Sequence, residues 1–124
     1  MAHTFRYQKK GYYLEFSGAI TMKELEWANS KIYEHEEFDN HKFQVFSLLN
    51  ADLAQVTEEG PERLAAADFG GSLSRGNVKV ALVAKDQTTV ELCKEYQKTT
   101  EILQSSWQVR IFSEQQQAIA WAED

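Results

Sequence analysis

The chain has 124 residues, of which 43% are hydrophobic and 12% aromatic, and its 13 basic and 19 acidic residues give a net charge of −6. This length and composition predict one globular domain rather than a disordered chain, and the negative charge disfavours binding to nucleic acid. The single cysteine, Cys93, excludes an intramolecular disulfide and a cysteine metal cluster.

The start of the chain shows no sign of a targeting segment. His3, Arg6 and Lys9 follow Met1 without the apolar stretch that a secretory signal needs. No apolar run elsewhere reaches the roughly 20 residues of a membrane span. We therefore expect a cytoplasmic protein.

The N-terminal third predicts a β-hairpin followed by a helix. Apolar and polar residues alternate over residues 5–16, and Gly11 supplies the backbone freedom for a tight turn. Thr21 and Glu24 form a capping box, in which the hydroxyl accepts from the backbone while the glutamate reaches back. Apolar residues then recur at helical spacing, which indicates a helix over about residues 21–36.

The middle of the chain predicts a buried strand and a second helix. Residues 43–49 are apolar on both alternations in their second half, as in a parallel strand covered on both faces. The next helix properly begins at Gly60, because Pro61 suits a first helical turn. We expect Gly70 and Gly71 to end or kink that helix.

The C-terminal part predicts two more strands, at 78–84 and 107–112, separated by a third helix that Asp86 caps. Ser113 and Gln116 form another capping box, which begins a fourth helix. The inward stripe of the third helix consists of Val90, Cys93, Tyr96, Gln97, Thr100 and Leu103.

These elements follow the order β-β-α-β-α-β-α-β-α. Helical crossovers make the last three strands parallel, with right-handed connections, and the short hairpin makes the first strand antiparallel to the second. We therefore predict a single α/β domain with a five-stranded mixed sheet and four helices.

Several segments together carry a family resemblance. They are Gly18-Ala-Ile-Thr-Met-Lys-Glu-Leu25, Phe38-Asp39, Phe43–Leu49 with Asn50-Ala-Asp52, Val78–Ala84, and Val109-Arg-Ile-Phe112-Ser-Glu followed by Ala118-Ile-Ala-Trp121. In these segments the chain resembles the SpoIIAA-like family of the STAS fold, named for sulfate transporters and anti-sigma-factor antagonists. The last segment is the most distinctive.

The resemblance implies a mixed sheet with helices mostly on one face, in a cytoplasmic regulatory module that acts through a protein partner. A serine or threonine at the head of the second helix is phosphorylated in STAS antagonists; here that region offers Thr57 but not the usual Asp-Ser-Ser/Thr-Gly stretch. The fold is also likened to the lipid-carrying CRAL-TRIO domains, which implies an apolar ligand by analogy.

The candidate binding residues follow two neighbouring strands. Asn50, Asp52 and Thr57 come after the strand at 43–49, and Lys85 and Asp86 come after the strand at 78–84. Open α/β sheets bind ligands at this edge, where helix N-termini offer N–H groups to anions. Alternatively, the same side chains serve only as turn residues and caps.

The other candidates have ordinary explanations. Cys93 lies on an inward stripe, where a thiol fills the core rather than reacts. His3, His35 and His41 lack the spacing of metal ligands, so we expect no metal site. Trp27 lies beside the apolar stripe of the first helix, so its partial exposure would suit an interface anchor in a homodimer.

Three functions remain open. The first is a non-enzymatic module that binds a protein partner or a small ligand at the strand edge. The second is a carrier of an apolar or lipid-like molecule, with a site near Leu64, Phe69 and Phe112. The third is a small hydrolase or isomerase that uses Asp52 and Lys85. We expect no cofactor, and we favour the first because no nucleophile has a recognisable base beside it.

Overall fold

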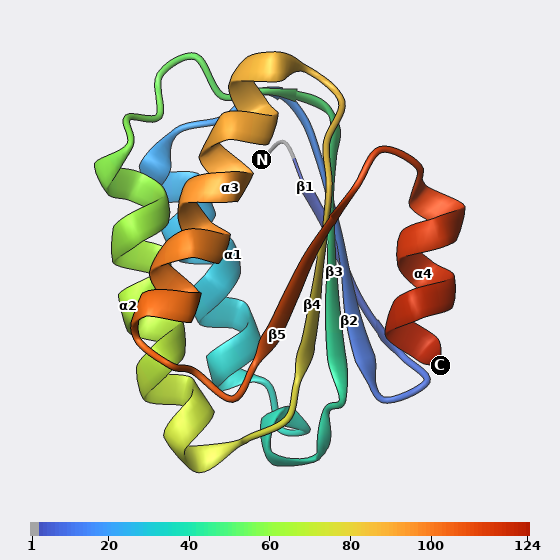
Figure 1. Cartoon of the computed structure of the whole chain (residues 1–124). Coiled ribbons are helices and arrows are strands. Elements are labelled where there is room, and N and C mark those ends of the chain that lie inside the picture. The colour runs from blue at the N-terminus through green and yellow to red at the C-terminus, as the bar shows by residue number, and fades with distance from the viewer. Residues whose placement is uncertain (1–2) are drawn as a thin grey trace.

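The computed structural model describes residues 3–124, which contain five strands, four α-helices and one short 3-10 helix. The α/β class and the predicted order of elements are both confirmed (Figure 1). In chain order the elements are β1 (His3–Gln8), β2 (Gly11–Ala19), α1 (Met22–Glu34), the 3-10 helix η1 (Phe38–Asn40), β3 (Phe43–Asp52), α2 (Glu59–Ser74), β4 (Lys79–Val83), α3 (Gln87–Ile102), β5 (Gln108–Phe112) and α4 (Gln115–Glu123).

The five strands form one mixed sheet in the order β1-β2-β3-β4-β5, which is also their order in the chain. β1 is antiparallel to β2, and every later strand runs parallel to the strand before it. Both predicted pairings are therefore confirmed. Because each crossover joins neighbouring strands, the crossover helices follow one another across the sheet.

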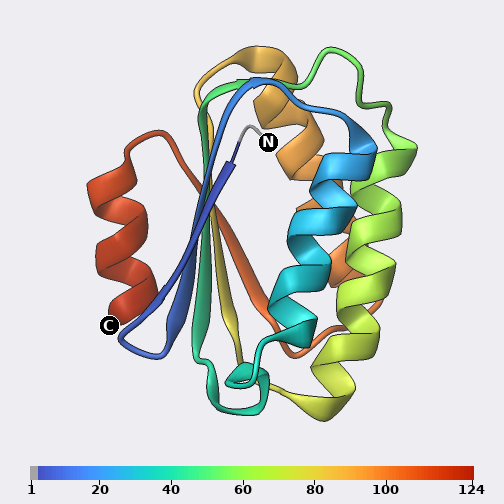
Figure 2. The same cartoon turned by 180° about the vertical axis from the view of Figure 1, so that it is seen from behind.

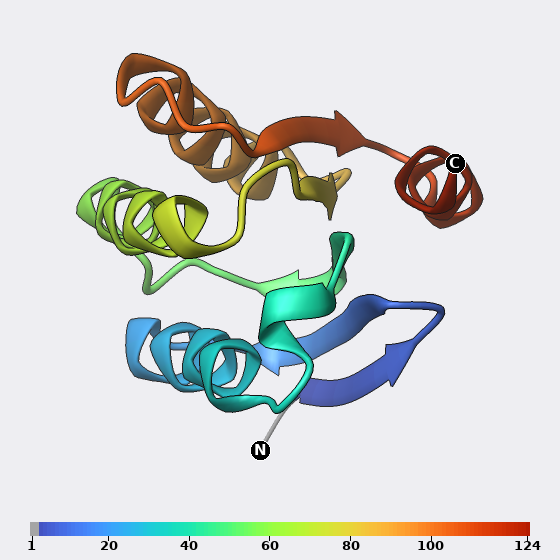
Figure 3. The same ribbon diagram turned by 90° about the horizontal axis from the view of Figure 1, so that it is seen from below.

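Three helices cover one face of the sheet and one covers the other. α1, α2 and α3 lie on the same face, and α4 lies alone on the opposite face (Figures 1 and 2). Seen from below, α1, α2 and α3 stand side by side as a layer over the strands (Figure 3). Helices mostly on one face are what the family resemblance implied for the sheet, although unrelated proteins share such layers.

β3 is largely buried on both faces from Phe43 to Leu48, close to the predicted 43–49, whereas its last four residues are exposed or half-buried. Its side chains alternate, so that Phe46 and Leu48 pack in the larger core under α1, α2 and α3. Phe43 and Val45 pack in a smaller core with Ala118 of α4. The sheet therefore separates two cores of different size.

The predicted hairpin is present, but Gly11 is not its turn residue. Lys9 and Lys10 occupy the turn with φ angles of 56° and 64°, the left-handed region that this kind of hairpin turn requires. Gly11 begins β2, and a Cβ there would clash with the ring of Phe43 on β3. The glycine is needed for close packing inside the sheet.

The predicted end of the second helix at its glycine pair is wrong, because α2 continues through Gly70 and Gly71 to Ser74. A Cβ at Gly71 would clash with the Tyr33 side chain of α1. Glycine weakens a helix by about 1 kcal/mol relative to alanine. Here its lack of a side chain lets α1 and α2 approach each other.

Two of the three predicted caps are confirmed. The Thr21 hydroxyl accepts a hydrogen bond from the Glu24 N–H at 3.3 Å, and Asp86 Oδ2 accepts one from the Thr89 N–H at 3.2 Å. The box at Ser113 is wrong, since the N-cap of α4 is Glu114 and has no side-chain cap bond. α4 begins one residue too late for the Ser113 hydroxyl to cap it.

Candidate functional site

The residues predicted at the strand edge are exposed and lie at or beyond the carboxyl ends of two parallel strands. Asn50 and Asp52 belong to β3 itself and pair with β2, beyond the last pair that β3 makes with β4. Thr57 precedes α2, and Lys85 and Asp86 lie between β4 and α3. Within residues 3–124, no hydrogen bond or ion pair joins Asp52 to Lys85.

Both carboxylates of this edge bind the local backbone. Asp52 Oδ1 accepts a hydrogen bond from the Ala54 N–H at 3.0 Å. Asp86 Oδ2 accepts from the N–H and the hydroxyl of Thr89, at 3.2 and 3.4 Å. These are the turn and cap roles of the alternative interpretation, and a role in binding stays a prediction.

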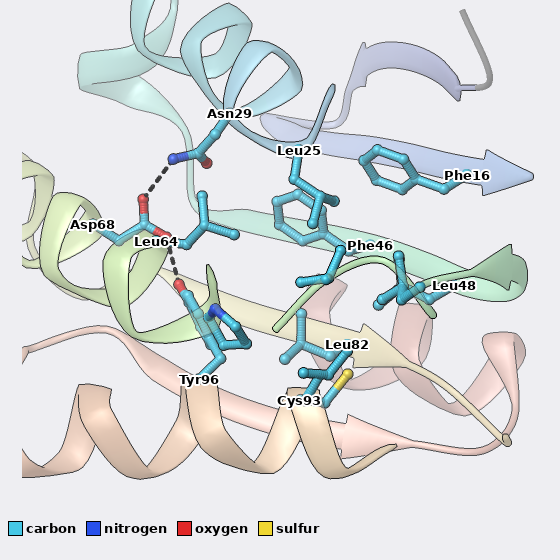
Figure 4. Close-up of a pocket in the computed structure, with 14 residues that line it drawn as sticks. Phe16, Leu25, Asn29, Phe46, Leu48, Leu64, Asp68, Leu82, Cys93 and Tyr96 are labelled. Carbon is cyan, nitrogen blue, oxygen red and sulfur yellow. Dashed lines mark hydrogen bonds between the residues drawn. The ribbon is translucent and has the colours of Figure 1, made fainter. Parts of the chain in front are cut away.

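A cavity of about 90 Å³ lies between the three-helix layer and the sheet (Figure 4). Its floor is made by apolar side chains of β2, β3 and β4, among them Phe16, Phe46 and Leu82. Leu53 and Val56, from the connection between β3 and α2, also line it. The wall is almost entirely apolar.

The three helices line this cavity in the same way. Each contributes a leucine and, four residues later, a polar side chain, and residues four apart lie on one helix face. α1, α2 and α3 each connect parallel strands and therefore point in the same direction. Hydrogen bonds between their polar members show that these lie at a similar height along the three helices. The pairs are Leu25 with Asn29, Leu64 with Asp68, and Leu92 with Tyr96.

The polar members meet at Asp68, whose side chain is buried between the helices. Oδ1 accepts hydrogen bonds from Asn29 Nδ2 at 3.1 Å and from the Tyr33 hydroxyl at 2.7 Å. Oδ2 accepts one from the Tyr96 hydroxyl at 2.5 Å. These four residues are called the Asp68 cluster below; Figure 4 shows Asn29 and Tyr96 on either side of Asp68.

No cation neutralises Asp68 within the described part of the chain, where no Lys, Arg or His forms an ion pair with it. Burial raises the pKa of Asp68, although the hydrogen bonds from Tyr96, Tyr33 and Asn29 act to lower it. Burial and the nearby carboxylate also raise the pKa of both tyrosines. The two hydroxyls therefore stay protonated and donate.

Cys93 also lines the cavity, and its side chain is buried as predicted. Burial raises the pKa of its thiol to about 12. At neutral pH the group is a thiol rather than the nucleophilic thiolate. Cys93 therefore serves as a core residue, as the sequence predicted.

Two of the three residues predicted near a carrier site lie outside this cavity. Leu64 lines it, whereas Phe69 and Phe112 do not. Phe112 packs with Trp121 of α4, their ring centroids 5.7 Å apart, in the core on the other face of the sheet. The alternation of side chains along an edge strand does not by itself tell toward which face of the sheet a given side chain points.

The buried histidine serves the fold. His41 Nδ1 donates to the Phe38 carbonyl at 2.6 Å, and Nε2 lies 3.1 Å from the amide nitrogen of Gln44. Burial is the main cause of its lowered pKa, so the neutral ring is favoured. Across residues 3–124, no group of three His, Cys, Asp or Glu side chains is arranged to hold a metal ion.

Trp27 is partly exposed, as predicted, with 43% of its surface accessible. The Lys31 ammonium lies 3.9 Å from the centre of its ring, over the ring face. Exposure is what an interface anchor needs. A homodimer through Trp27 stays a prediction.

The Asp68 cluster is not among the sites that the sequence predicted. A signal was present, because Asp68 lies four residues after Leu64 on the buried side of a helix, where an aspartate is unusual. The Leu-x-x-x-polar spacing in three helices was a second signal. Neither shows by itself that the side chains meet.

Comparison of the chain with protein-family models, with curated proteins and with solved structures finds no match. The SpoIIAA-like resemblance therefore stays an expectation from the sequence.

Proposed function

We propose that the chain is a non-enzymatic, cytoplasmic binding module of the SpoIIAA-like type that holds a small apolar ligand between its three-helix layer and its sheet. The observation that carries this proposal is the apolar cavity lined by β2, β3, β4 and all three helices of that layer. The proposal joins the first and second functions that the sequence left open.

The composition of the cavity supports a ligand site. Small-molecule sites are mostly apolar and contain a few polar groups that orient the ligand. Here the polar groups come from the Asp68 cluster, and the rest of the wall is leucine, valine, phenylalanine, proline and cysteine. A buried carboxylate with a raised pKa inside such a cavity is a common mark of a functional site.

The volume of the cavity limits the size of the ligand. About 90 Å³ is below the ~150 Å³ of an engineered cavity that binds benzene, and well below the ~300 Å³ of typical ligand pockets. A molecule of a few heavy atoms fits without rearrangement. A longer chain requires movement of the wall.

A protein partner at the strand edge is a second candidate function. The supporting observation is that five exposed residues lie at or beyond the carboxyl ends of the neighbouring strands β3 and β4: Asn50, Asp52, Thr57, Lys85 and Asp86. Catalysis by Asp52 and Lys85 has less support, since within residues 3–124 no hydrogen bond or ion pair joins the two side chains and Asp52 binds the Ala54 N–H. Within residues 3–124, no helix is both long and apolar enough to cross a membrane.

Xenon, a small apolar probe, tests the cavity directly. We expect saturable NMR shifts of the methyl groups of Leu64, Leu82 and Leu92 under xenon, because dry apolar cavities bind it. Leu64→Phe should abolish these shifts by filling the cavity. Leu73→Phe is the matched control, since Leu73 is on the same helix but 77% exposed.

Equal xenon shifts in wild type and Leu64→Phe, or none in either, would contradict the proposal. Native mass spectrometry after gentle purification then searches for the natural ligand. A small molecule that copurifies with wild type but not with Leu64→Phe supports the carrier role, and its absence from both counts against that role.

A further inference from the structure

We propose that the cavity selects ligands with a short apolar body and a primary ammonium group, and that the Asp68 carboxylate receives that group. The inference rests on the proposed function, because it names the ligand class of the same cavity. It follows from three features of the Asp68 cluster: its unbalanced charge, its free acceptor position and its place on one side of an apolar space.

The first feature is the unbalanced charge. Asp68 is 6% exposed, and its hydrogen-bond donors, Asn29, Tyr33 and Tyr96, are all neutral groups. Buried carboxylates are ordinarily paired with a cation, because neutral donors replace water only in part. A ligand ammonium would supply the counter-charge that the described residues do not.

The second feature is the acceptor capacity. An ionised carboxylate offers about four acceptor positions. Oδ1 accepts two hydrogen bonds in the cluster, whereas Oδ2 accepts only that of Tyr96. Oδ2 therefore retains a position for one further donor.

The third feature is where these groups lie. Asn29, Asp68 and Tyr96 line the cavity together on one side, whereas Phe16, Leu48 and Leu82 lie away from them (Figure 4). The space is thus polar at one end and apolar elsewhere. An amphiphilic ligand with one small head group matches this distribution.

The chemistry of the head group follows from the acceptor. A carboxylate or phosphate would meet a like charge, and a hydroxyl would supply a hydrogen bond without a charge, whereas an ammonium supplies both.

A purely structural role is the competing explanation. Asp68 links α2 to α1 through Asn29 and Tyr33 and to α3 through Tyr96, so it also holds the three-helix layer together. In that case Asp68 would affect folding but would not distinguish an amine from an alcohol of equal length. Ligand selectivity therefore separates the two roles.

The test compares n-butylamine, 1-butanol and butyrate, which share a short chain and differ in the head group. Their dissociation constants would be measured by NMR titration of wild type at slightly alkaline pH. We expect the amine to bind roughly tenfold more tightly than the alcohol, as a charge-assisted hydrogen bond provides, and butyrate to bind least. Asp68→Asn should remove the preference for the amine.

Asp39→Asn is the matched control, because it removes one exposed carboxylate and should keep the preference. If Asp68→Asn does not fold, repeating the wild-type titrations with amine and alcohol at acidic pH decides the question, because protonation of Asp68 should remove the preference while the amine stays an ammonium. Equal affinities for amine and alcohol in wild type, or an unchanged preference in folded Asp68→Asn, would overturn the inference alone. Failure of xenon and of all three ligands to bind would overturn the proposed function with it.

Discussion

Asp68 is the residue on which the polar side of the cavity depends. Its two oxygens accept hydrogen bonds from Asn29, Tyr33 and Tyr96, which belong to the helices on either side of α2. Removing the carboxylate leaves the donors of Asn29, Tyr33 and Tyr96 without their acceptor. A buried donor without an acceptor costs about 1–3 kcal/mol, and of these three only Tyr96 is buried. The residue therefore matters for the free energy of unfolding as well as for any ligand.

The titration of Asp68 should contribute to the pH dependence of the free energy of unfolding. Because burial raises the pKa of Asp68 above its ordinary value of 3.8, the folded protein holds the proton more tightly than the unfolded chain. Its contribution is fully present below pH 3.8 and is lost as pH rises through the folded-state pKa. We expect the free energy of unfolding of wild type, minus that of Asp68→Asn, to fall with rising pH in that window.

Urea unfolding followed by tryptophan fluorescence over a pH series provides this difference. Subtracting the two free energies of unfolding cancels the contribution of all other titrating carboxylates, because both proteins contain them. A difference that stays flat or grows with pH would show that the folded state does not favour the protonated form of Asp68.

At the scale of the element, α2 combines two neighbouring glycines that have different roles. No atom lies within 4 Å of the place where a Cβ of Gly70 would stand, whereas a Cβ of Gly71 would clash with Tyr33. Tyr33 cannot simply swing away, since its hydroxyl donates to Asp68 at 2.7 Å. The contact between α1 and α2 thus depends on one glycine and not on its neighbour.

We expect Gly70→Ala to raise the free energy of unfolding by roughly 0.5–1 kcal/mol, because alanine favours the helix and meets no obstacle. Gly71→Ala should lower it by roughly 1–3 kcal/mol through overpacking against Tyr33. Urea unfolding of the two variants beside wild type checks both signs. Similar effects from the two substitutions would contradict the close approach of α1 and α2.

The two helix caps could be predicted because they depend on contacts within a single element. The caps at Thr21 and Asp86 use a hydrogen-bond partner three residues away, so the sequence of one turn is enough to predict them. α2 continues past Gly70 and Gly71, although their low helix propensity favours an end there. The fit of Gly71 against Tyr33 of α1 is a tertiary contact, which local propensity does not include.

At the scale of the whole molecule, α4 covers a face of the sheet that no other helix reaches (Figure 1). Its Ala118 and Ala122 pack on Phe43, Val45 and Val83. Polar contacts add to this packing, since the Tyr13 hydroxyl donates to Glu123 at 2.5 Å and the Lys79 ammonium donates to the Trp121 carbonyl at 3.0 Å. One short helix therefore shields the whole smaller core.

A chain that ends after Phe112 should lose its fixed tertiary structure, because the apolar side chains of the smaller core would face water. Increased binding of the dye anilinonaphthalene sulfonate and loss of NMR dispersion would report this change. Tyr13→Phe is the control, and it should cost only about 1 kcal/mol, the net value of one hydrogen bond. A folded truncated chain would show that β2, β3 and β4 do not need α4.

Taken by itself, the sequence determined the α/β class, the order of the elements, the parallel strands and the two helix caps, because periodicity, crossover length and capping depend on residues close together in the chain. Only the tertiary structure decided that Phe112 packs against α4 and that Asn29, Asp68 and Tyr96 share one cavity. Asn29, Asp68 and Tyr96 lie on three different helices. Whether they meet depends on which helices are neighbours and on how far each helix is shifted along its axis. The same packing that joins them leaves the buried carboxylate facing an apolar space.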